Sequence, residues 1–157
     1  MKLLVIGLGS VNGDDQIGWE IIDALEKEAS NNLPITVYKS KGAGIDWFSS
    51  LDQTDYQCVV FVDAIMSDGK LGNIREIDLN RLDSSQFLTQ YSSHNISIID
   101  SINLAKNLGM LGMPVKFIGV EIGSASPLTD MSELIKVSVP VLIERICSLT
   151  QSAAVLE

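Results

Sequence analysis

Short, almost wholly apolar segments alternate with amphipathic helical patterns along this chain, and the alternation constrains the fold more than any single motif. Residues 3–7 (Leu-Leu-Val-Ile-Gly) and 58–62 (Cys-Val-Val-Phe-Val) carry no charged side chain, which is typical of strands buried on both faces. After the first of them, one face of a helical pattern collects the apolar residues Ile17, Ile21, Ala24 and Leu25. Buried strands separated by helices form mostly parallel sheets with a helical layer on each side. We therefore expect an α/β three-layer sandwich.

The other expected elements are less strongly marked. They are strands over residues 34–38 and 115–120, an edge strand with charged neighbours over 73–77, a short helix ending near residue 51, a helix that His94 leads into, and a last helix over 131–149. Pro140 interrupts the last helical pattern. Because proline lacks an N–H and clashes with the preceding turn, it either kinks this helix or marks its start. We expect one domain over residues 1–151 and a frayed tail over 152–157.

The charge balance argues against two kinds of partner. The 157 residues include 20 acidic and 11 basic side chains, a net charge of -9, so the surface repels nucleic-acid phosphates and anionic membranes. No segment resembles a secretion signal or a membrane-spanning helix. Cys58 and Cys147 lie far apart in apolar stretches, outside any metal-ligand spacing, which is typical of buried, reduced thiols. We expect a cytoplasmic protein, and a monomer, since no heptad pattern or long apolar stripe occurs.

Three ionisable residues fall at or near the carboxyl ends of the expected strands. Asp15 follows the first strand, Asp63 ends the third, and His94, the only histidine, opens a helix after the edge strand. Loops that leave the carboxyl ends of parallel strands meet at one edge of the sheet, where sites form. Two carboxylates and an imidazole are a mixed oxygen and nitrogen donor set that suits a divalent transition metal. Three protein ligands would leave coordination positions open for a substrate group or water.

Each of these residues also has an ordinary structural interpretation. Asp15 could cap the first helix, and Asp63 could accept hydrogen bonds from backbone amides of the following loop. His94, between serine and asparagine, could be a solvated residue at a helix start. These alternatives stay open for each residue taken singly, and only the coincidence of all three at one edge favours a site.

A nucleotide-binding loop is a second hypothesis for the first strand end. Gly7-Leu8-Gly9 lies between a strand and a helix, as in a dinucleotide fingerprint, but Asn12 occupies the position of the third glycine. No acidic residue follows the second strand to bind a ribose, and Asp14 and Asp15 would repel a diphosphate. The sequence also has no GxSxG elbow, no P-loop and no cysteine in an electropositive setting.

Several segments, in order along the chain, resemble one protein family. They are Leu-Val-Ile-Gly-Leu-Gly-Ser-Val-Asn-Gly-Asp-Asp-Gln-Ile-Gly at 4–18, Lys-Gly-Ala-Gly at 41–44, Val-Asp-Ala at 62–64, His94, Phe-Ile-Gly-Val-Glu at 117–121 and Leu-Thr at 128–129. Together they resemble the hydrogenase maturation endopeptidases over nearly the whole chain. Two features depart from the family pattern. Ser10 stands in place of the usual asparagine in a loop one residue short, and Trp19 stands where a small aliphatic residue is commoner.

The resemblance implies a fold, an activity and a site. The fold would be a compact sandwich around a twisted five-stranded sheet. The activity would be that of a peptidase, aspartic-type or nickel-dependent, which removes a C-terminal extension from the nickel-loaded precursor of a nickel-iron hydrogenase large subunit. The family's metal-binding positions fall on Asp15, Asp63 and His94, which would then be the catalytic and nickel-binding residues.

Several roles for these residues remain open at this point. The three side chains could read substrate-borne nickel as a recognition tag, the metal could polarise the scissile carbonyl or a water, or an aspartate could act as general base. Gly42 and Gly44 would let the substrate backbone approach the site, or would simply form a tight turn. The alternatives to a peptidase are a non-catalytic nickel-binding accessory or chaperone of hydrogenase assembly and a nucleotide-binding Rossmann-like module.

Overall fold

The computed structural model describes residues 1–29, 32–41, 45–52, 55–67, 69–79, 95–123 and 125–152. Strands and helices alternate along the chain, as the sequence pattern predicts. The strands are β1 (Leu3–Gly7), β2 (Ile35–Lys39), β3 (Cys58–Ile65), β4 (Ile74–Asp78) and β5 (Val115–Glu121). The α-helices are α1 (Ile17–Ala29), α3 (Asn95–Asn107), α4 (Glu133–Lys136) and α5 (Ser138–Leu149), and two 3₁₀ helices are η1 (Gly13–Gln16) and η2 (Asp46–Asp52).

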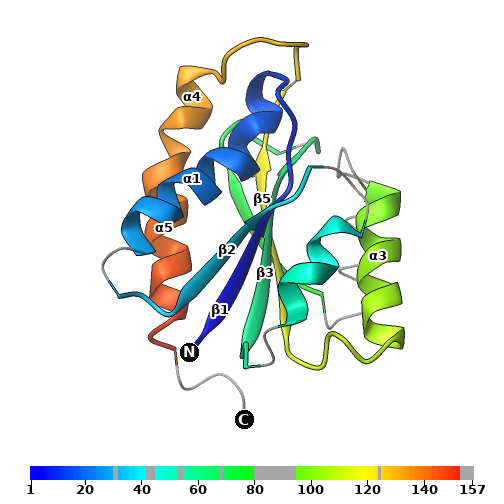
Figure 1. The fold of residues 1–157 in the computed structure, drawn as a ribbon. Helices are drawn as coiled ribbons and strands as arrows, with labels where there is room; N and C mark the ends of the chain where they lie inside the picture. The colour runs from blue at the N-terminus through cyan, green and yellow to red at the C-terminus, as the bar shows by residue number, and fades with distance from the viewer. Residues whose placement is uncertain are drawn as a thin grey trace.

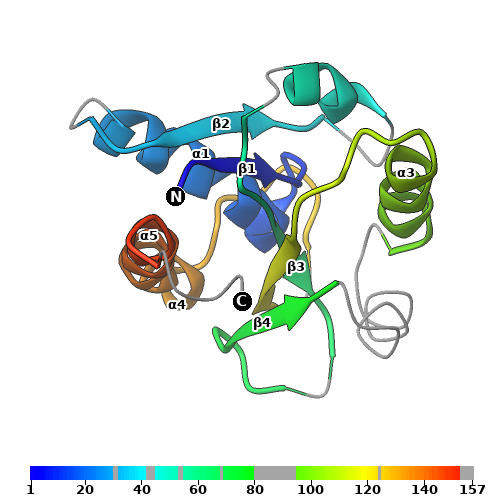
Figure 2. The same cartoon turned by 90° about the horizontal axis from the view of Figure 1, so that it is seen from below.

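The described strands form one five-stranded sheet in the order β2-β1-β3-β5-β4. All neighbouring pairs are parallel except β4 with β5, which is antiparallel. The helices α1, α4 and α5 cover one face of the sheet, and α3 and η2 cover the other (Figures 1 and 2). The expected three-layer α/β sandwich with a mostly parallel five-stranded sheet is therefore confirmed, and so is the position of residues 74–78 at its edge.

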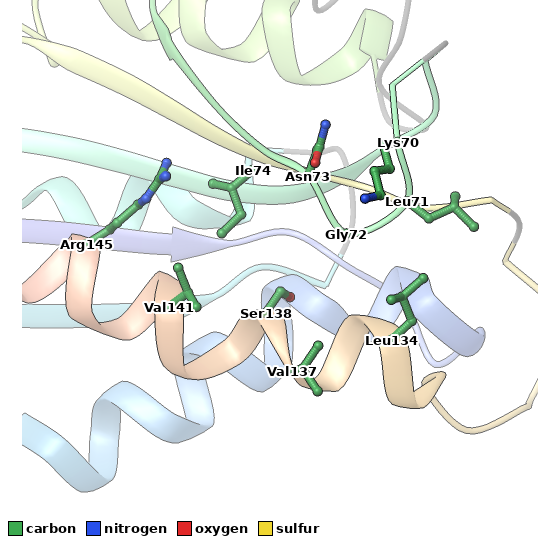
Figure 3. A pocket seen from close by; sticks show the side chains of 10 residues that line it. All are labelled: Lys70, Leu71, Gly72, Asn73, Ile74, Leu134, Val137, Ser138, Val141 and Arg145. Carbon is green, nitrogen blue, oxygen red and sulfur yellow. The ribbon is translucent and has the colours of Figure 1, made fainter.

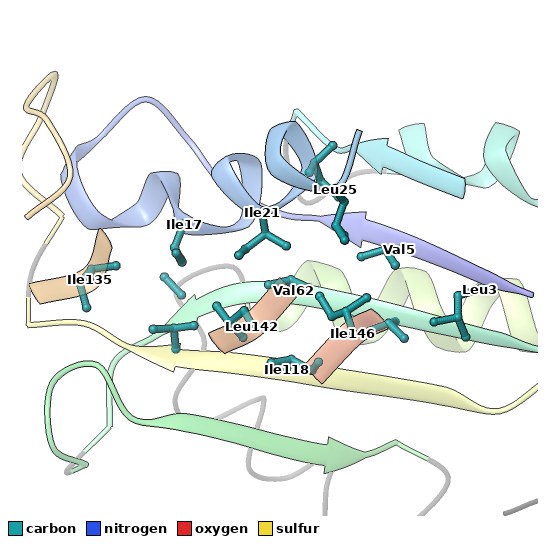
Figure 4. Close-up of a cluster of buried hydrophobic side chains, with 14 of the residues drawn as sticks. Leu3, Val5, Ile17, Ile21, Leu25, Val62, Ile118, Ile135, Leu142 and Ile146 are labelled. Atoms are coloured by element: carbon teal, nitrogen blue, oxygen red, sulfur yellow. The ribbon is translucent and has the colours of Figure 1, made fainter. Parts of the chain in front are cut away.

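Side-chain alternation along β3 divides the core into two clusters. Val60 and Val62 belong to the cluster beneath α1 and α5, of which Figure 4 shows a part. Val59 and Phe61 belong to the cluster on the opposite face, with Ile98 of α3. Because successive strand residues point to opposite faces, a strand buried on both sides is apolar at consecutive positions. The central strands β1 and β3 are buried at every residue, which explains their uninterrupted apolar sequence.

Two elements differ in extent from their sequence-based expectations. β3 continues to Ile65, so Asp63 lies within the strand and not at its end, because β5 continues alongside and pairs Asp63 with Gly119. The last helical pattern is divided into α4 and α5, and Pro140 lies in the first turn of α5. Proline is tolerated in a first turn because N–H groups there have no acceptor within the helix. Of the two expectations for Pro140, the helix start is therefore confirmed.

No helix in the described ranges has the length and apolar character needed to cross a membrane. The amino-terminal ammonium group donates a hydrogen bond to the carbonyl oxygen of Thr150 (2.5 Å), which ties the start of the chain to the end of α5. The expected domain boundary at residue 151 and the expected tail stay predictions, since residues 153–157 lie outside the described part of the chain.

Candidate functional site

The topology brings the segments that carry Asp15 and Asp63 to one region of the sheet. β1 pairs with β3 up to Gly7, and the next N–H, of Leu8, donates to the carbonyl oxygen of Val62 (2.8 Å). The chain then turns into η1, which contains Asp15 and contacts β3. Asp63 directly follows Val62. Asp15 and Asp63 therefore lie on contacting elements beside the carboxyl end of β1, with Asp63 inside β3 and not at its end.

Gly18 holds the first turn of α1 against this strand end. A Cβ atom on Gly18 would lie 1.8 Å from the carbonyl oxygen of Leu8 and 2.7 Å from that of Val62. No real side chain fits at such distances, and both neighbours are backbone atoms that cannot rotate away. The absence of a side chain at this position thus lets α1, and η1 in front of it, approach β3 closely.

Asp15 is buried within η1. Its side chain is 5% exposed and accepts a hydrogen bond from Ser10 Oγ at Oδ2 (2.5 Å). Its backbone N–H donates to the carbonyl oxygen of Asn12 (3.0 Å) within η1. Ser10, the residue that departs from the family pattern, thus donates directly to this carboxylate. The capping position of η1 is Asn12, which makes no side-chain capping bond, and a capping role of Asp15 towards α1 stays a prediction.

Asp14 has a different role from its neighbour. Its carboxylate accepts hydrogen bonds from the backbone N–H of Ser132 (2.7 Å) and from Ser132 Oγ (3.0 Å). Ser132 directly precedes α4, so Asp14 fixes the segment after β5 to η1. Of the two consecutive aspartates, Asp15 is therefore the buried one. The Asp14 carboxylate instead accepts hydrogen bonds from Ser132, in the segment between β5 and α4.

Asp63 is fully buried within β3. Its Oδ1 accepts a hydrogen bond from the backbone N–H of Ala64 (2.8 Å). Asp63 thus makes one bond of the kind that its structural interpretation predicts, with a backbone amide that follows it. Because Val62 and Ala64 point into the cluster beneath α1 and α5, strand alternation places the Asp63 side chain on the opposite face, on the side of α3. The pairing of Asp63 with Gly119 of β5 holds the backbone that carries this carboxylate.

The remaining predicted site residues lie outside the described part of the chain. These are His94, Gly42 and Gly44. Among the residues that the structure does describe, no three His, Cys, Asp or Glu side chains gather into a metal-binding group. The described ranges exclude His94, so its place beside Asp15 and Asp63 stays a prediction. The helix α3, which begins at Asn95, lies on the face to which Asp63 belongs.

Glu121 is a buried carboxylate whose partners the sequence does not reveal. Its side chain is 1% exposed and pairs with Arg75 Nε of β4 (3.1 Å). It also accepts hydrogen bonds from the backbone N–H of Ser67 (3.0 Å) and from Ser67 Oγ. These contacts join β3, β4 and β5 where β5 ends. We assign Glu121 to the structure and not to the site, because a charged partner and a hydroxyl donor account for its burial.

The glycines of the first loop are explained by close packing with the chain itself. A Cβ on Gly7 would lie 2.3 Å from the carbonyl oxygen of Gly18, and one on Gly9 would lie 2.8 Å from that of Asp15 and against the ring of Trp19. Trp19 Nε1 in turn donates to the carbonyl oxygen of Ser40 (2.8 Å), which ties α1 to the end of β2. The Cβ side of Gly9 is thus filled by the Asp15 backbone and the Trp19 ring, so packing within the chain explains this glycine without a bound nucleotide.

The cysteines are unsuited to nucleophilic catalysis. Burial raises the pKa of Cys58 to about 11 and also raises the pKa of Cys147, so neither forms a thiolate near neutral pH. Both are free thiols; Cys58 is buried as expected, whereas Cys147 is only half-buried.

The Cys58 thiol should also make the protein less stable in alkali. The pKa of about 11 in the folded chain exceeds the ordinary thiol pKa of 9.0. Above pH 9 the unfolded chain therefore loses a proton that the folded chain retains, and the free energy of unfolding falls as pH rises towards 11. We expect this group to account for a loss of about 2 kcal/mol across that window. Urea denaturation of Cys58→Ala at several pH values should show a flatter decline than the parent protein, and an equal decline would contradict the assignment.

Comparison with known proteins identifies the family. The family model for hydrogenase maturation proteases matches residues 20–149. A Methanocaldococcus jannaschii protein assigned to these proteases is 30% identical over 122 residues, which cover 76% of this chain and 75% of the relative. The solved structure of the hydrogenase-maturating endopeptidase HybD of Escherichia coli has a TM-score of 0.79 at 18% identity, with 98% of this chain and 94% of HybD covered. The hydrogenase 2 maturation peptidase of a Thaumarchaeota archaeon has a TM-score of 0.66 at 26% identity, covering 95% and 97%.

The fold thus matches that of solved hydrogenase maturation peptidases. The chain is a member of the hydrogenase maturation protease family. The resemblance seen in the sequence motifs is confirmed, and the sheet implied by it agrees with the described strands.

Proposed function

We propose that this protein is the endopeptidase that removes the C-terminal extension from the nickel-loaded precursor of a nickel-iron hydrogenase large subunit. Membership of the hydrogenase maturation protease family supports the reaction class. The observation that carries the proposal is the burial of two carboxylates, Asp15 and Asp63, on contacting elements beside the carboxyl end of β1. Buried carboxylates are costly, and their concentration at a strand-end edge is typical of a site.

The donor set of the proposed site suits the metal that the precursor carries. Carboxylate oxygens from Asp15 and Asp63 with an imidazole nitrogen from His94 would bind a divalent transition metal and leave positions for its existing ligands. The Ser10 hydroxyl orients the Asp15 carboxylate, and the paired backbone of β3 fixes Asp63. In this proposal, nickel arrives with the substrate, so a precursor without nickel lacks the contact that positions its scissile bond.

Hydrolysis adds water across the scissile peptide bond. The attacking oxygen loses a proton as it bonds to the carbonyl carbon, and the leaving amine gains one as the C–N bond breaks. A carboxylate within reach of the water can accept the first proton, and an aspartate of this pair is our proposed general base. The same residues would thus serve both nickel recognition and proton transfer.

The surroundings of the site suit a protein substrate. Exposed apolar side chains lie in the segments that follow the carboxyl ends of all four parallel strands: Val11 after β1, Ile45 after β2, Met66 after β3 and Leu128 after β5. Leu128 is 82% exposed and adopts a left-handed backbone conformation with φ of 54°, which is rare for leucine. Exposed apolar groups around a candidate site favour contact with a macromolecule.

A cleavage assay tests the proposed function. The purified protein is mixed with nickel-loaded or nickel-free precursor from its own source, and mass spectrometry follows the precursor's C-terminus. We expect loss of one discrete C-terminal peptide from the nickel-loaded precursor alone, and no loss with Asp63→Asn or His94→Ala. Cleavage that survives both substitutions would overturn the site and retain the peptidase. Binding of the nickel-loaded precursor without cleavage would contradict the peptidase and favour a nickel-binding accessory protein.

A further inference from the structure

A groove of about 610 Å³ lies on the α4 and α5 side of the sheet, next to its β4 edge. Leu71 and Ile74 line it from the β4 side, and Leu134, Val137 and Val141 line it from the helices (Figure 3). A Cβ atom on Gly72 would lie 3.8 Å from the carbonyl oxygen of Leu134, so the turn before β4 approaches α4 here. A volume of this size accommodates several residues of an extended peptide.

The walls of the groove are apolar and exposed. Leu71 is 47% exposed, Leu134 51%, Val137 67% and Val141 45%. Exposed aliphatic side chains are ordinary when scattered, but four of them around one concave surface form a patch that water solvates poorly. The groove therefore favours a ligand with apolar side chains.

Two cations flank these apolar walls. Lys70 lies on the β4 side of the groove and Arg145 on α5. The described Lys39, Lys116 and Lys136 each pair with a carboxylate, whereas neither Lys70 nor Arg145 makes an ion pair with any residue that the structure describes. The whole chain has a net charge of -9, so two cations without a carboxylate partner in the described ranges, beside one apolar groove, are a local reversal of its charge. The complementary ligand is apolar and carries carboxylates.

The groove lies at the same end of the sheet as the candidate site. β4 begins beside the end of β5, with Ile74 opposite Val120, and the N–H of Gly72 donates to the carbonyl oxygen of Glu121 (2.8 Å). Asp63 of β3 pairs with Gly119 on the other side of β5. Two strand spacings, about 10 Å, separate β4 from β3, a distance that three or four extended residues span. Since the Asp63 side chain belongs to the opposite face of the sheet, a ligand in the groove does not block it.

We propose that this groove docks an apolar segment bearing Asp or Glu side chains, contributed by the protein substrate at a point distinct from its cleavage site. The identity of the partner rests on the proposed function, whereas the chemistry of the segment rests on the groove itself. Docking here holds the substrate by contacts that do not change during peptide hydrolysis. The groove therefore acts on substrate binding and leaves the chemical step unaffected.

A pair of matched substitutions tests the proposal. Leu134→Glu places a negative charge on the groove wall, and Leu104→Glu places the same charge on α3, at a leucine of similar exposure (44%) on the opposite face. With the nickel-loaded precursor, we expect Leu134→Glu to raise KM about tenfold or more and to leave kcat within about twofold. Leu104→Glu should leave both unchanged, and Leu134→Met should retain the parental KM. An unchanged KM for Leu134→Glu, or an equal rise for Leu104→Glu, would overturn the proposal.

A second measurement separates failure of the groove from failure of the proposed function. If the parent protein does not cleave the precursor, the proposed function fails, and an NMR titration then decides on the groove. The probe is a synthetic peptide of alternating leucine and glutamate, and the control replaces each glutamate with lysine. Amide shifts confined to the groove, at Leu71, Gly72, Leu134 and Val141, with the acidic peptide only would support docking. Shifts elsewhere, or no shifts, would overturn the proposal. So would a dimer in analytical ultracentrifugation that Leu134→Glu dissociates, because the occupant of the groove would then be a second copy of the chain.

Discussion

Asp15→Asn is expected to lower the rate of precursor cleavage by about a thousandfold or more, whereas Asp14→Asn leaves the rate within about twofold. The two residues are adjacent in sequence, yet Asp15 is buried at the strand end and Asp14 bonds to Ser132. Asparagine keeps the size of aspartate and an acceptor oxygen, so Asp14→Asn can still hold Ser132. In Asp15→Asn, the loss of charge weakens a metal contact and removes a proton acceptor.

The assay is single-turnover cleavage of nickel-loaded precursor, with thermal unfolding of each variant as the check on folding. This pair of variants is informative because the same substitution at neighbouring positions controls for the change in net charge. A thousandfold loss in Asp14→Asn with normal activity in Asp15→Asn would mean that the other aspartate is the functional one. Normal activity in both would remove η1 from the site.

Gly18→Ala is expected to destabilise the fold by about 4 kcal/mol or more, enough to leave much of the protein unfolded. The added methyl group would lie 1.8 Å from the carbonyl oxygen of Leu8 and 2.7 Å from that of Val62. Relieving those contacts requires α1 to move away from the sheet, and α1 carries Ile17, Ile21 and Leu25 in the core. Overpacking that must shift backbone costs far more than overpacking that a side chain can absorb.

Gly112→Ala is the matched control for that experiment. A Cβ on Gly112 meets no atom within 4 Å, so we expect its effect on the free energy of unfolding to be within about 0.5 kcal/mol. Urea denaturation followed by circular dichroism measures both variants. Parental stability in Gly18→Ala would contradict the close approach of α1 to β1 and β3, and with it the position of η1 beside Asp63.

The fold was predictable from the sequence because its signals are local. The apolar runs of β1 and β3 can be predicted as strands because a strand buried on both faces is apolar at consecutive positions. The charged residues of β4 indicate an edge strand. The proximity of Asp15 and Asp63 follows from the same rule, since the carboxyl ends of parallel strands share one edge of a sheet. The role of His94 is a prediction of a different kind, since it depends on the family resemblance and on a residue outside the described ranges.

The details that sequence could not provide depend on contacts between distant residues. Asp14 bonds to Ser132, which lies 118 positions away, and no local pattern distinguishes Asp14 from Asp15. Glu121 resembles an ordinary strand-end carboxylate until Arg75 and Ser67 are seen around it. The length of β3 beyond Val62 is set by pairing with β5 and not by the β3 sequence alone. Likewise, the groove arises only where α4 and α5 pack beside the β4 edge.

The most direct test of the account is to locate nickel on the protein. Crystals grown with Ni²⁺ would be measured at energies on either side of the nickel absorption edge. The proposed site should give an anomalous peak at about 2 Å from a carboxylate oxygen of Asp15, a carboxylate oxygen of Asp63 and a ring nitrogen of His94. Ordered nickel at another position, with none shared by these three side chains, would contradict it.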